Sequence, residues 1–83
     1  MRRYRARLRS GSTLATMTLR WDPNDRRYVC ERTSAGGDVR RESFEYLRDV
    51  IHQLRWDAVI DDTLLRALLK DRGGTRSATG SKL

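Results

Sequence analysis

Apolar residues alternate with polar residues over the first half of this chain and follow a helical period over the second half. The alternation from residue 1 to about 43 predicts β-strands, and the spacing from about 44 onward predicts helices. We therefore expect an α+β fold, in which an N-terminal antiparallel β-meander of three or four strands is covered on one face by two C-terminal helices. Residues 1–73 would form this single domain, and residues 74–83, dominated by Gly, Ser and Thr, a flexible tail.

The first predicted hairpin pairs apolar side chains across its two strands, provided that Gly11-Ser12 is a two-residue loop. The expected partners are Tyr4 with Leu19, Ala6 with Met17, and Leu8 with Ala15. The turn sequence Asp22-Pro23-Asn24-Asp25 predicts the second hairpin. It would place Leu19 opposite Tyr28 and Met17 opposite Cys30.

Both hairpins bury the same face of the middle strand, and a slip of one residue in either would put arginines into the core. A third turn around residues 35–38 is expected to lead into a short edge strand from Val39 to Glu42. The sheet would therefore have one apolar face and one open, polar face.

Arginine dominates the predicted open face. The expected registers place six arginines there: Arg3, Arg5, Arg7, Arg9, Arg20 and Arg27. Arg3, Arg20 and Arg27 would form one row across the strands. Residues 1–41 carry eleven arginines and four acidic residues, whereas basic and acidic residues balance in residues 42–83. A surface with this charge is typical of proteins that contact phosphates.

Two functions follow from this charge pattern. The first is a small, basic, non-enzymatic protein that binds DNA or RNA through contacts between arginines and phosphates. The alternative is a small accessory or inhibitor protein, of the kind that phages encode, that docks on an acidic surface of a larger protein or nucleoprotein complex. A solvated face that only keeps the protein soluble is the simplest structural explanation.

The second half predicts two amphipathic helices. The first has an apolar stripe of Phe44, Leu47, Val50, Ile51 and Leu54, with Ser43 as its expected cap. The second begins at a cap of Asp61 or Asp62 and ends at Gly73-Gly74. Its apolar ridge consists of Leu64, Leu65, Leu68 and Leu69. Because this ridge is broad for one small core, an isologous homodimer through this helix is a further hypothesis.

The sequence contains no catalytic or metal-binding pattern. His52 stands alone on the polar side of a helix, and Cys30 falls on the inward face without a second cysteine nearby. The aromatic residues Tyr4, Trp21 and Tyr28 are also expected to point inward. We therefore expect no cofactor and no metal.

The sequence also bears on localisation. No apolar run reaches the length of a membrane span, and no apolar stretch of a secretory signal follows the basic N-terminus. The single cysteine favours a reducing compartment, the cytoplasm. The final Ser81-Lys82-Leu83 matches a peroxisomal address. However, the arginine-rich, lysine-poor composition favours a GC-rich bacterial or phage genome.

Overall fold

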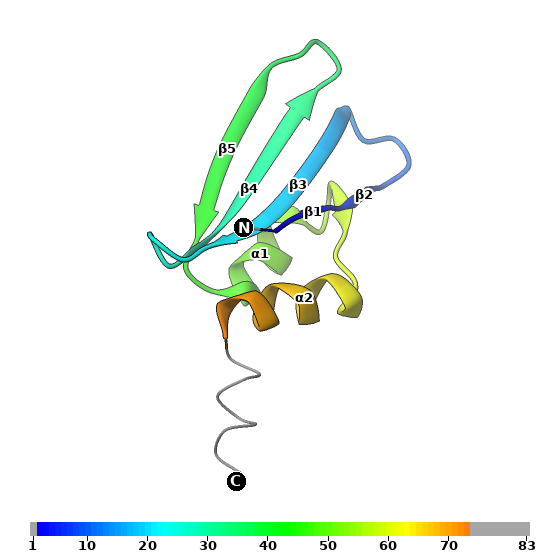
Figure 1. The fold of residues 1–83 in the computed structure, drawn as a ribbon. Coiled ribbons are helices and arrows are strands. Elements are labelled where there is room, and N and C mark those ends of the chain that lie inside the picture. Colours follow the sequence, from blue (N-terminus) through cyan, green and yellow to red (C-terminus); the bar gives the residue numbers. More distant parts are fainter. Residues whose placement is uncertain (1, 74–83) are drawn as a thin grey trace, which may run out of the picture.

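Four antiparallel strands form the main sheet in the order β1-β3-β4-β5, and two helices cover one of its faces (Figure 1). The computed structural model describes residues 2–73. Its elements are β1 (Arg3–Arg5), β2 (Arg7–Leu8), β3 (Leu14–Asp22), β4 (Arg27–Ser34), β5 (Val39–Phe44), α1 (Leu47–Leu54), β6 (Ala58–Val59) and α2 (Asp62–Arg72). The predicted α+β meander with C-terminal helices is thus confirmed, with four strands in its sheet. The flexible tail predicted for residues 74–83 lies outside the described residues.

The core lies between the inward face of the sheet and the two helices. Its fully buried side chains come from β3 and β4 on one side and from α1 and α2 on the other: Met17, Leu19, Tyr28, Cys30, Val50, Leu54 and Leu68. The strand residues among them alternate along the chain, and the helix residues recur at helical spacing. Neither helix of residues 2–73 has the length and apolar character needed to cross a membrane.

The first hairpin follows the predicted register only at its N-terminal end. Tyr4 lies opposite Leu19, and the Ala6 N–H donates to the Met17 carbonyl at 2.9 Å, as expected. The predicted pair of Leu8 with Ala15 is wrong, because the chain leaves β3 after Ala6. Leu8 instead lies opposite Ala58, in a second, two-stranded sheet of β2 and β6.

Two local features explain this departure. A register shift between Leu14 and Thr16 interrupts the alternation of β3, so that Ala15 is exposed while Leu14 packs against the core. Gly11 does not form a two-residue hairpin loop. With a φ of 89°, it sits in a reverse turn that is closed by the Ser12 N–H and the Arg9 carbonyl at 3.0 Å.

The second hairpin keeps the predicted buried face but is shifted by two residues. Leu19 lies opposite Cys30, and Trp21 lies opposite Tyr28, so the predicted pairs of Leu19 with Tyr28 and Met17 with Cys30 are wrong. The Asp22 carboxylate accepts hydrogen bonds from the N–H groups of the two residues after Pro23, at 2.9 and 3.3 Å. Arg26 adopts a φ of 54°, which extends the loop to residues 23–26.

The turn at residues 35–38 is present, and it leads into the edge strand β5, which runs two residues beyond its predicted end. Phe44 therefore belongs to the sheet, and it still packs against the core. The helix cap predicted at Ser43 is wrong. The N-cap of α1 is Tyr46, whose side chain makes no capping hydrogen bond.

Helix α2 has the caps that its sequence predicts. The Asp61 carboxylate accepts a hydrogen bond from the Leu64 N–H at 2.9 Å, and Gly73 ends the helix with a φ of 91°. The leucine ridge divides between core and surface. Leu64 and Leu68 are buried in the core, Leu65 is half-buried, and 40% of Leu69 is exposed. Leu64 and Leu68 thus stabilise the monomer and are not available to a partner.

Candidate nucleic-acid interface

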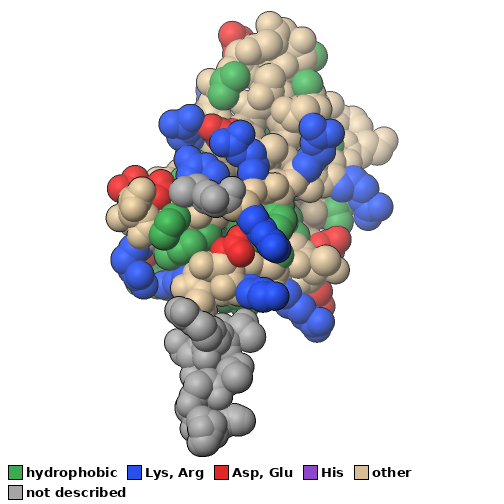
Figure 2. Space-filling view, viewed as in Figure 1, with side chains coloured by type: hydrophobic (Ala, Val, Ile, Leu, Met, Phe, Trp, Pro, Cys, Tyr) green, Lys and Arg blue, Asp and Glu red, His purple; other side chains and the backbone are tan. Residues whose placement is uncertain are grey.

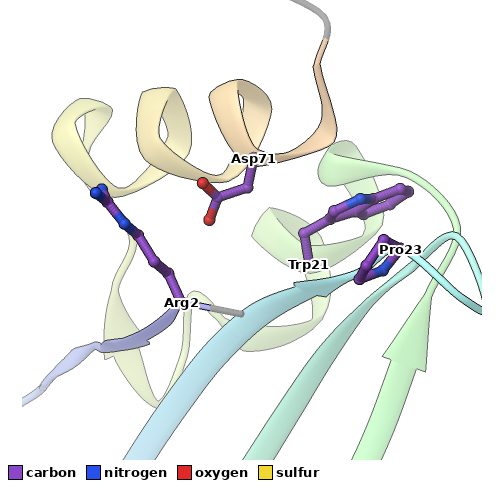
Figure 3. A pocket seen from close by; sticks show the side chains of 4 residues that line it. All are labelled: Arg2, Trp21, Pro23 and Asp71. Carbon is purple, nitrogen blue, oxygen red and sulfur yellow. The ribbon is translucent and has the colours of Figure 1, made fainter.

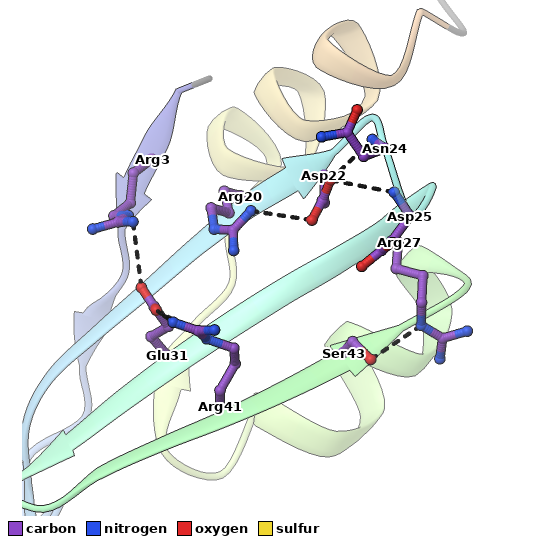
Figure 4. Close-up of polar contacts among 9 residues, drawn as sticks. All are labelled: Arg3, Arg20, Asp22, Asn24, Asp25, Arg27, Glu31, Arg41 and Ser43. Carbon is purple, nitrogen blue, oxygen red and sulfur yellow. Dashed lines mark hydrogen bonds and ion pairs between the residues drawn. The ribbon is translucent and has the colours of Figure 1, made fainter.

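The side of the main sheet away from α1 and α2 forms what we call the open face (Figure 4). It consists of the outward positions of the four strands: Arg3, Arg5, Thr16, Thr18, Arg20, Asp22, Arg27, Val29, Glu31, Thr33, Val39, Arg41 and Ser43. This set contains five arginines and only two carboxylates. The open face is therefore positive, and its positive side chains come from every strand of the sheet.

Four of the six arginines predicted for this face lie on it, namely Arg3, Arg5, Arg20 and Arg27. Arg3 lies opposite Arg20, but the predicted row through Arg27 is wrong. In the observed register, Arg20 lies opposite Val29, and Arg27 lies opposite Asp22. The shift of two residues in the second hairpin therefore separates two arginines that the sequence reasoning had placed side by side.

Arg7 and Arg9 do not lie on the main sheet, contrary to the prediction. Arg7 lies opposite Val59 in the small sheet, and the Arg9 N–H donates to the Asp57 carbonyl at 3.0 Å. Arg41 takes a place on the open face that the sequence analysis missed. It lies opposite Glu31, and continuing the same alternation into the predicted edge strand would have identified it.

Glu31 joins two of the open-face arginines (Figure 4). Its carboxylate accepts hydrogen bonds from Nε and Nη2 of Arg41, at 3.1 and 2.8 Å, and lies 3.6 Å from Nη2 of Arg3. The hydrogen bond from Arg41 is the main cause that holds the pKa of Glu31 below its ordinary value. Glu31 is therefore ionised at neutral pH, and it offsets part of the positive charge at the centre of the face.

Asp22 and Ser43 orient two further arginines. Nη1 of Arg20 lies 3.6 Å from the Asp22 carboxylate, and Nε of Arg27 donates to the Ser43 hydroxyl at 3.0 Å. The pKa of Asp22 is lowered, first by its hydrogen bond from the Asp25 N–H. These contacts hold the two guanidinium groups at the open face.

Arg3, Arg5 and Arg41 remain accessible to a ligand despite these contacts, whereas the Arg20 side chain is only 16% exposed. The side chains of Arg3 and Arg41 are 59% and 65% exposed, although both meet Glu31. A guanidinium group has five N–H donors, so Arg41 retains donors after its two hydrogen bonds to Glu31. Arg5 is also exposed, and its side chain makes no hydrogen bond or ion pair with residues 2–73. Basic side chains also spread over the surface seen in Figure 2, with fewer acidic ones between them.

Arg32 differs from these arginines, because it points to the helix side of the sheet. Its guanidinium donates to the Asp57 carboxylate at 2.7 Å and also to the Glu42 carboxylate. Arg32 thereby links β4, β5 and the turn between α1 and β6. Arg32 thus forms structural ion pairs and does not belong to the open face.

The inward orientation predicted for three aromatic residues agrees with the structure. Trp21 and Tyr28 are buried, with ring centroids 4.9 Å apart, and Tyr4 is partly buried against the core. The Tyr4 hydroxyl donates to the Asp71 carboxylate at 2.7 Å. Burial, followed by this hydrogen bond, raises the pKa of Tyr4. These rings support α2 and are not available for stacking on a base.

Trp56 is an exposed aromatic residue that the sequence analysis did not single out. It lies in the turn between α1 and β6, and 74% of it is exposed. The Arg55 guanidinium lies 5.0 Å from the centre of its ring, and Arg9 adjoins the same surface hollow. Trp56 belongs neither to the strand alternation nor to the apolar stripes of the two helices, and this was the signal in the sequence that it could be exposed.

A second hollow lies at the other end of the sheet and is too small for most ligands. Arg2, Trp21, Pro23 and Asp71 line it, and its volume is about 260 Å³ (Figure 3). Ligand pockets usually range from about 300 to 1,000 Å³. Asp71 already accepts the hydrogen bond from Tyr4, so we assign this hollow to the packing of α2.

Cys30 and His52, the two residues considered for chemistry in the sequence, differ in their exposure. Burial raises the pKa of the Cys30 thiol to about 11, which disfavours the reactive thiolate. His52 is exposed on α1. Among residues 2–73, no three His, Cys, Asp or Glu side chains gather into a group that could hold a metal ion.

Known proteins do not add to the description of this surface. In comparisons with protein-family models, with curated proteins and with solved structures, none matched this chain.

Proposed function

We propose that this protein binds nucleic acid by contacting phosphates with the arginines of the open face. The observation that carries the proposal is the excess of guanidinium groups over carboxylates on this face, with arginines on all four strands. Arginine donates in a planar fork that matches phosphate oxygens, so it suits such contacts better than lysine does. The full chain also carries a formal net charge of +7, which attracts a polyanion over a distance.

Affinity in this mechanism comes mainly from the release of counterions as arginines neutralise phosphates. The open face has no aromatic side chain among its outward positions in residues 2–73. Its polar groups other than arginine are the Asp22 and Glu31 carboxylates and short threonine and serine hydroxyls. We therefore expect little discrimination between base sequences from this face, because phosphate contacts position a protein without reading sequence.

A second function, docking on an acidic protein surface, is favoured by the edge strand β5. Strand β5 lies at one end of the sheet order, and 65% of Val39 at its start is exposed. An exposed sheet edge is able to pair with an extended segment of a partner. However, Arg40, Arg41 and Glu42 charge this strand, and charged residues are typical of edges that avoid pairing. We therefore rank docking second.

The proposal is tested by measuring nucleic-acid affinity at several salt concentrations for the parent and two matched triple variants. The first variant combines Arg3→Gln, Arg5→Gln and Arg27→Gln on the open face. The second combines Arg48→Gln, Arg66→Gln and Lys70→Gln, which removes the same charge from the exposed side of the helices.

We expect the open-face variant to lower the magnitude of the slope of log K against log salt by about 0.7 to 0.9 for each lost contact. The helix variant should change it much less. Circular dichroism and thermal melting would establish that both variants fold. Equal effects of the two variants, or no binding by the parent at about 50 mM salt, where electrostatic association is strong, would contradict the proposal.

A further inference from the structure

The turn between α1 and β6 presents an indole ring to solvent. With 74% of its surface exposed, Trp56 is the most accessible of the large apolar side chains in residues 2–73. Trp21, in contrast, is buried beside Tyr28 and below the Arg72 guanidinium. An exposed tryptophan adds nothing to the core, and large aromatic side chains at surfaces are typical of binding sites.

Several contacts fix the backbone that carries this ring. The Arg9 guanidinium donates through Nε to the Arg55 carbonyl, and the Arg9 N–H donates to the Asp57 carbonyl at 3.0 Å. The Asp57 N–H donates to the Leu54 carbonyl at 3.0 Å, and the Asp57 carboxylate accepts from Arg32 at 2.7 Å. The residues on both sides of Trp56 are therefore held in place, so the ring stands on an ordered turn.

Two arginines lie at the hollow that contains this ring. The Arg55 guanidinium lies over it, 5.0 Å from its centroid, and Arg9 lines the same hollow of about 500 Å³. Since Trp56 is mostly exposed, Arg55 leaves much of the ring surface to a ligand. The site thus combines a flat, apolar surface with two cations, which suits a planar ring carried on an anionic backbone.

Strands β1 and β2, which we together call the N-terminal strand, connect this site to the open face. The arginines of the N-terminal strand alternate along the chain, with Arg3 and Arg5 on the main sheet and Arg7 on the small sheet beside β6. Arg9 follows at the Trp56 hollow. A nucleic acid that lies along this strand would therefore meet guanidinium groups from the open face as far as Trp56.

We propose that Trp56 stacks on an unpaired base, so that the preferred ligand is a single-stranded nucleic acid with its phosphates on the arginines of the N-terminal strand. This inference rests on the proposed function and adds the class of nucleic acid. In a duplex the bases are stacked on each other and paired, so a surface indole reaches them only at an end. In a single strand every base offers a flat face, and stacking on an aromatic side chain tolerates any sequence.

The test compares the parent with Trp56→Ala, using an oligothymidylate and a DNA duplex of equal length at the same salt concentration. We expect the substitution to weaken oligothymidylate binding by about five-fold to 150-fold, the range for loss of one stacked base. Duplex affinity should stay within about two-fold of the parent value, because its phosphate contacts remain. Trp56→Phe should restore part of the loss, because it restores an aromatic ring.

Fluorescence supplies a direct reading of the same contact. The chain has two tryptophans, and Trp21 is buried, so iodide quenching in the parent reports mainly on Trp56. Oligothymidylate should shield Trp56 from iodide. Tyr46→Ala is the matched control for Trp56→Ala in the binding assay. Tyr46 is also exposed, and the Arg48 guanidinium lies 4.9 Å from the centre of its ring, but Tyr46 lies at the opposite end of α1.

The outcomes separate this inference from the proposed function. If the parent binds both nucleic acids and Trp56→Ala binds oligothymidylate as tightly as the parent, the inference fails and the proposed function stands. An equal loss for duplex and single strand would also overturn the inference. No binding of either nucleic acid at low salt would reject both. Shielding of Trp56 by polyglutamate but not by oligothymidylate would replace the inference with a protein-docking site.

Discussion

Glu31 is predicted to oppose nucleic-acid binding, although it stabilises the open face. It is one of the two carboxylates on that face, and it holds the guanidinium groups of Arg3 and Arg41. Replacing Glu31 with Gln keeps the size of the side chain but removes its charge and both ion pairs. We therefore expect Glu31→Gln to bind nucleic acid more tightly than the parent, with a steeper dependence on salt.

The magnitude follows from the contacts of Glu31. Removing one negative charge releases roughly one arginine charge to neutralise phosphate, which should add about 0.7 to 0.9 to the magnitude of the salt slope. At about 0.1 M salt this corresponds to binding about five-fold to eight-fold tighter. The cost to folding should stay near 1 kcal/mol or below, because the arginine partners are mostly exposed and surface ion pairs contribute little.

Fluorescence anisotropy with a labelled oligonucleotide at several salt concentrations would measure both quantities. Glu45→Gln is the matched control, because Glu45 is exposed in the bend before α1 and its replacement changes the net charge by the same amount. If Glu31→Gln binds no more tightly than Glu45→Gln, the claim that Glu31 weakens nucleic-acid binding by offsetting arginine charge at the open face is refuted. Weaker binding by Glu31→Gln alone would show instead that the two arginines need Glu31 to orient them.

Three predictions concern the stability of the fold. Asp61→Ala removes the cap of α2 and should lower the free energy of unfolding by about 1 kcal/mol in a urea titration. The Cys30 thiol, with its pKa raised to about 11, should react with iodoacetamide only as fast as the protein unfolds, and stability should fall as pH rises from the ordinary thiol pKa toward 11. Leu68→Ala should cost about 2 to 5 kcal/mol and Leu69→Ala much less, and sedimentation showing the same mass for parent and Leu69→Ala at high concentration would reject a dimer through Leu69.

The buried face of the sheet could be predicted from sequence, because alternation fixes which residues of a strand point to the same side of the sheet. The second hairpin is shifted by two residues, yet Met17 and Leu19 still point inward, since an even shift preserves the side of every residue. The exact partners could not be predicted in the same way. They depend on the loop, in which the Asp22 side chain and the positive φ of Arg26 add length that the turn sequence alone did not reveal.

The remaining differences arise from contacts between distant parts of the chain. Leu8 leaves β3 to lie opposite Ala58, in a strand of only two residues that has no detectable period of its own. The surroundings of Trp56 likewise depend on this pairing. Because β2 pairs with β6, Arg9, which follows β2, lies against the turn that carries Trp56. Such tertiary contacts override local patterns, and the sequence reasoning therefore placed Arg7 and Arg9 on the main sheet, where neither lies.

The observed register also reduces the repulsion between arginines on the open face. A continuous row of arginines across neighbouring strands would destabilise the sheet, because like charges directly opposite each other repel. In the structure, Arg27 lies opposite Asp22, and Arg41 lies opposite Glu31. Arg3 does lie opposite Arg20, but Arg3 lies 3.6 Å from the Glu31 carboxylate and Arg20 lies 3.6 Å from the Asp22 carboxylate. Carboxylates therefore offset the repulsion between the arginines of the free protein. Binding then requires phosphates to compete with these carboxylates, so charge substitutions at the open face should alter affinity much more than stability.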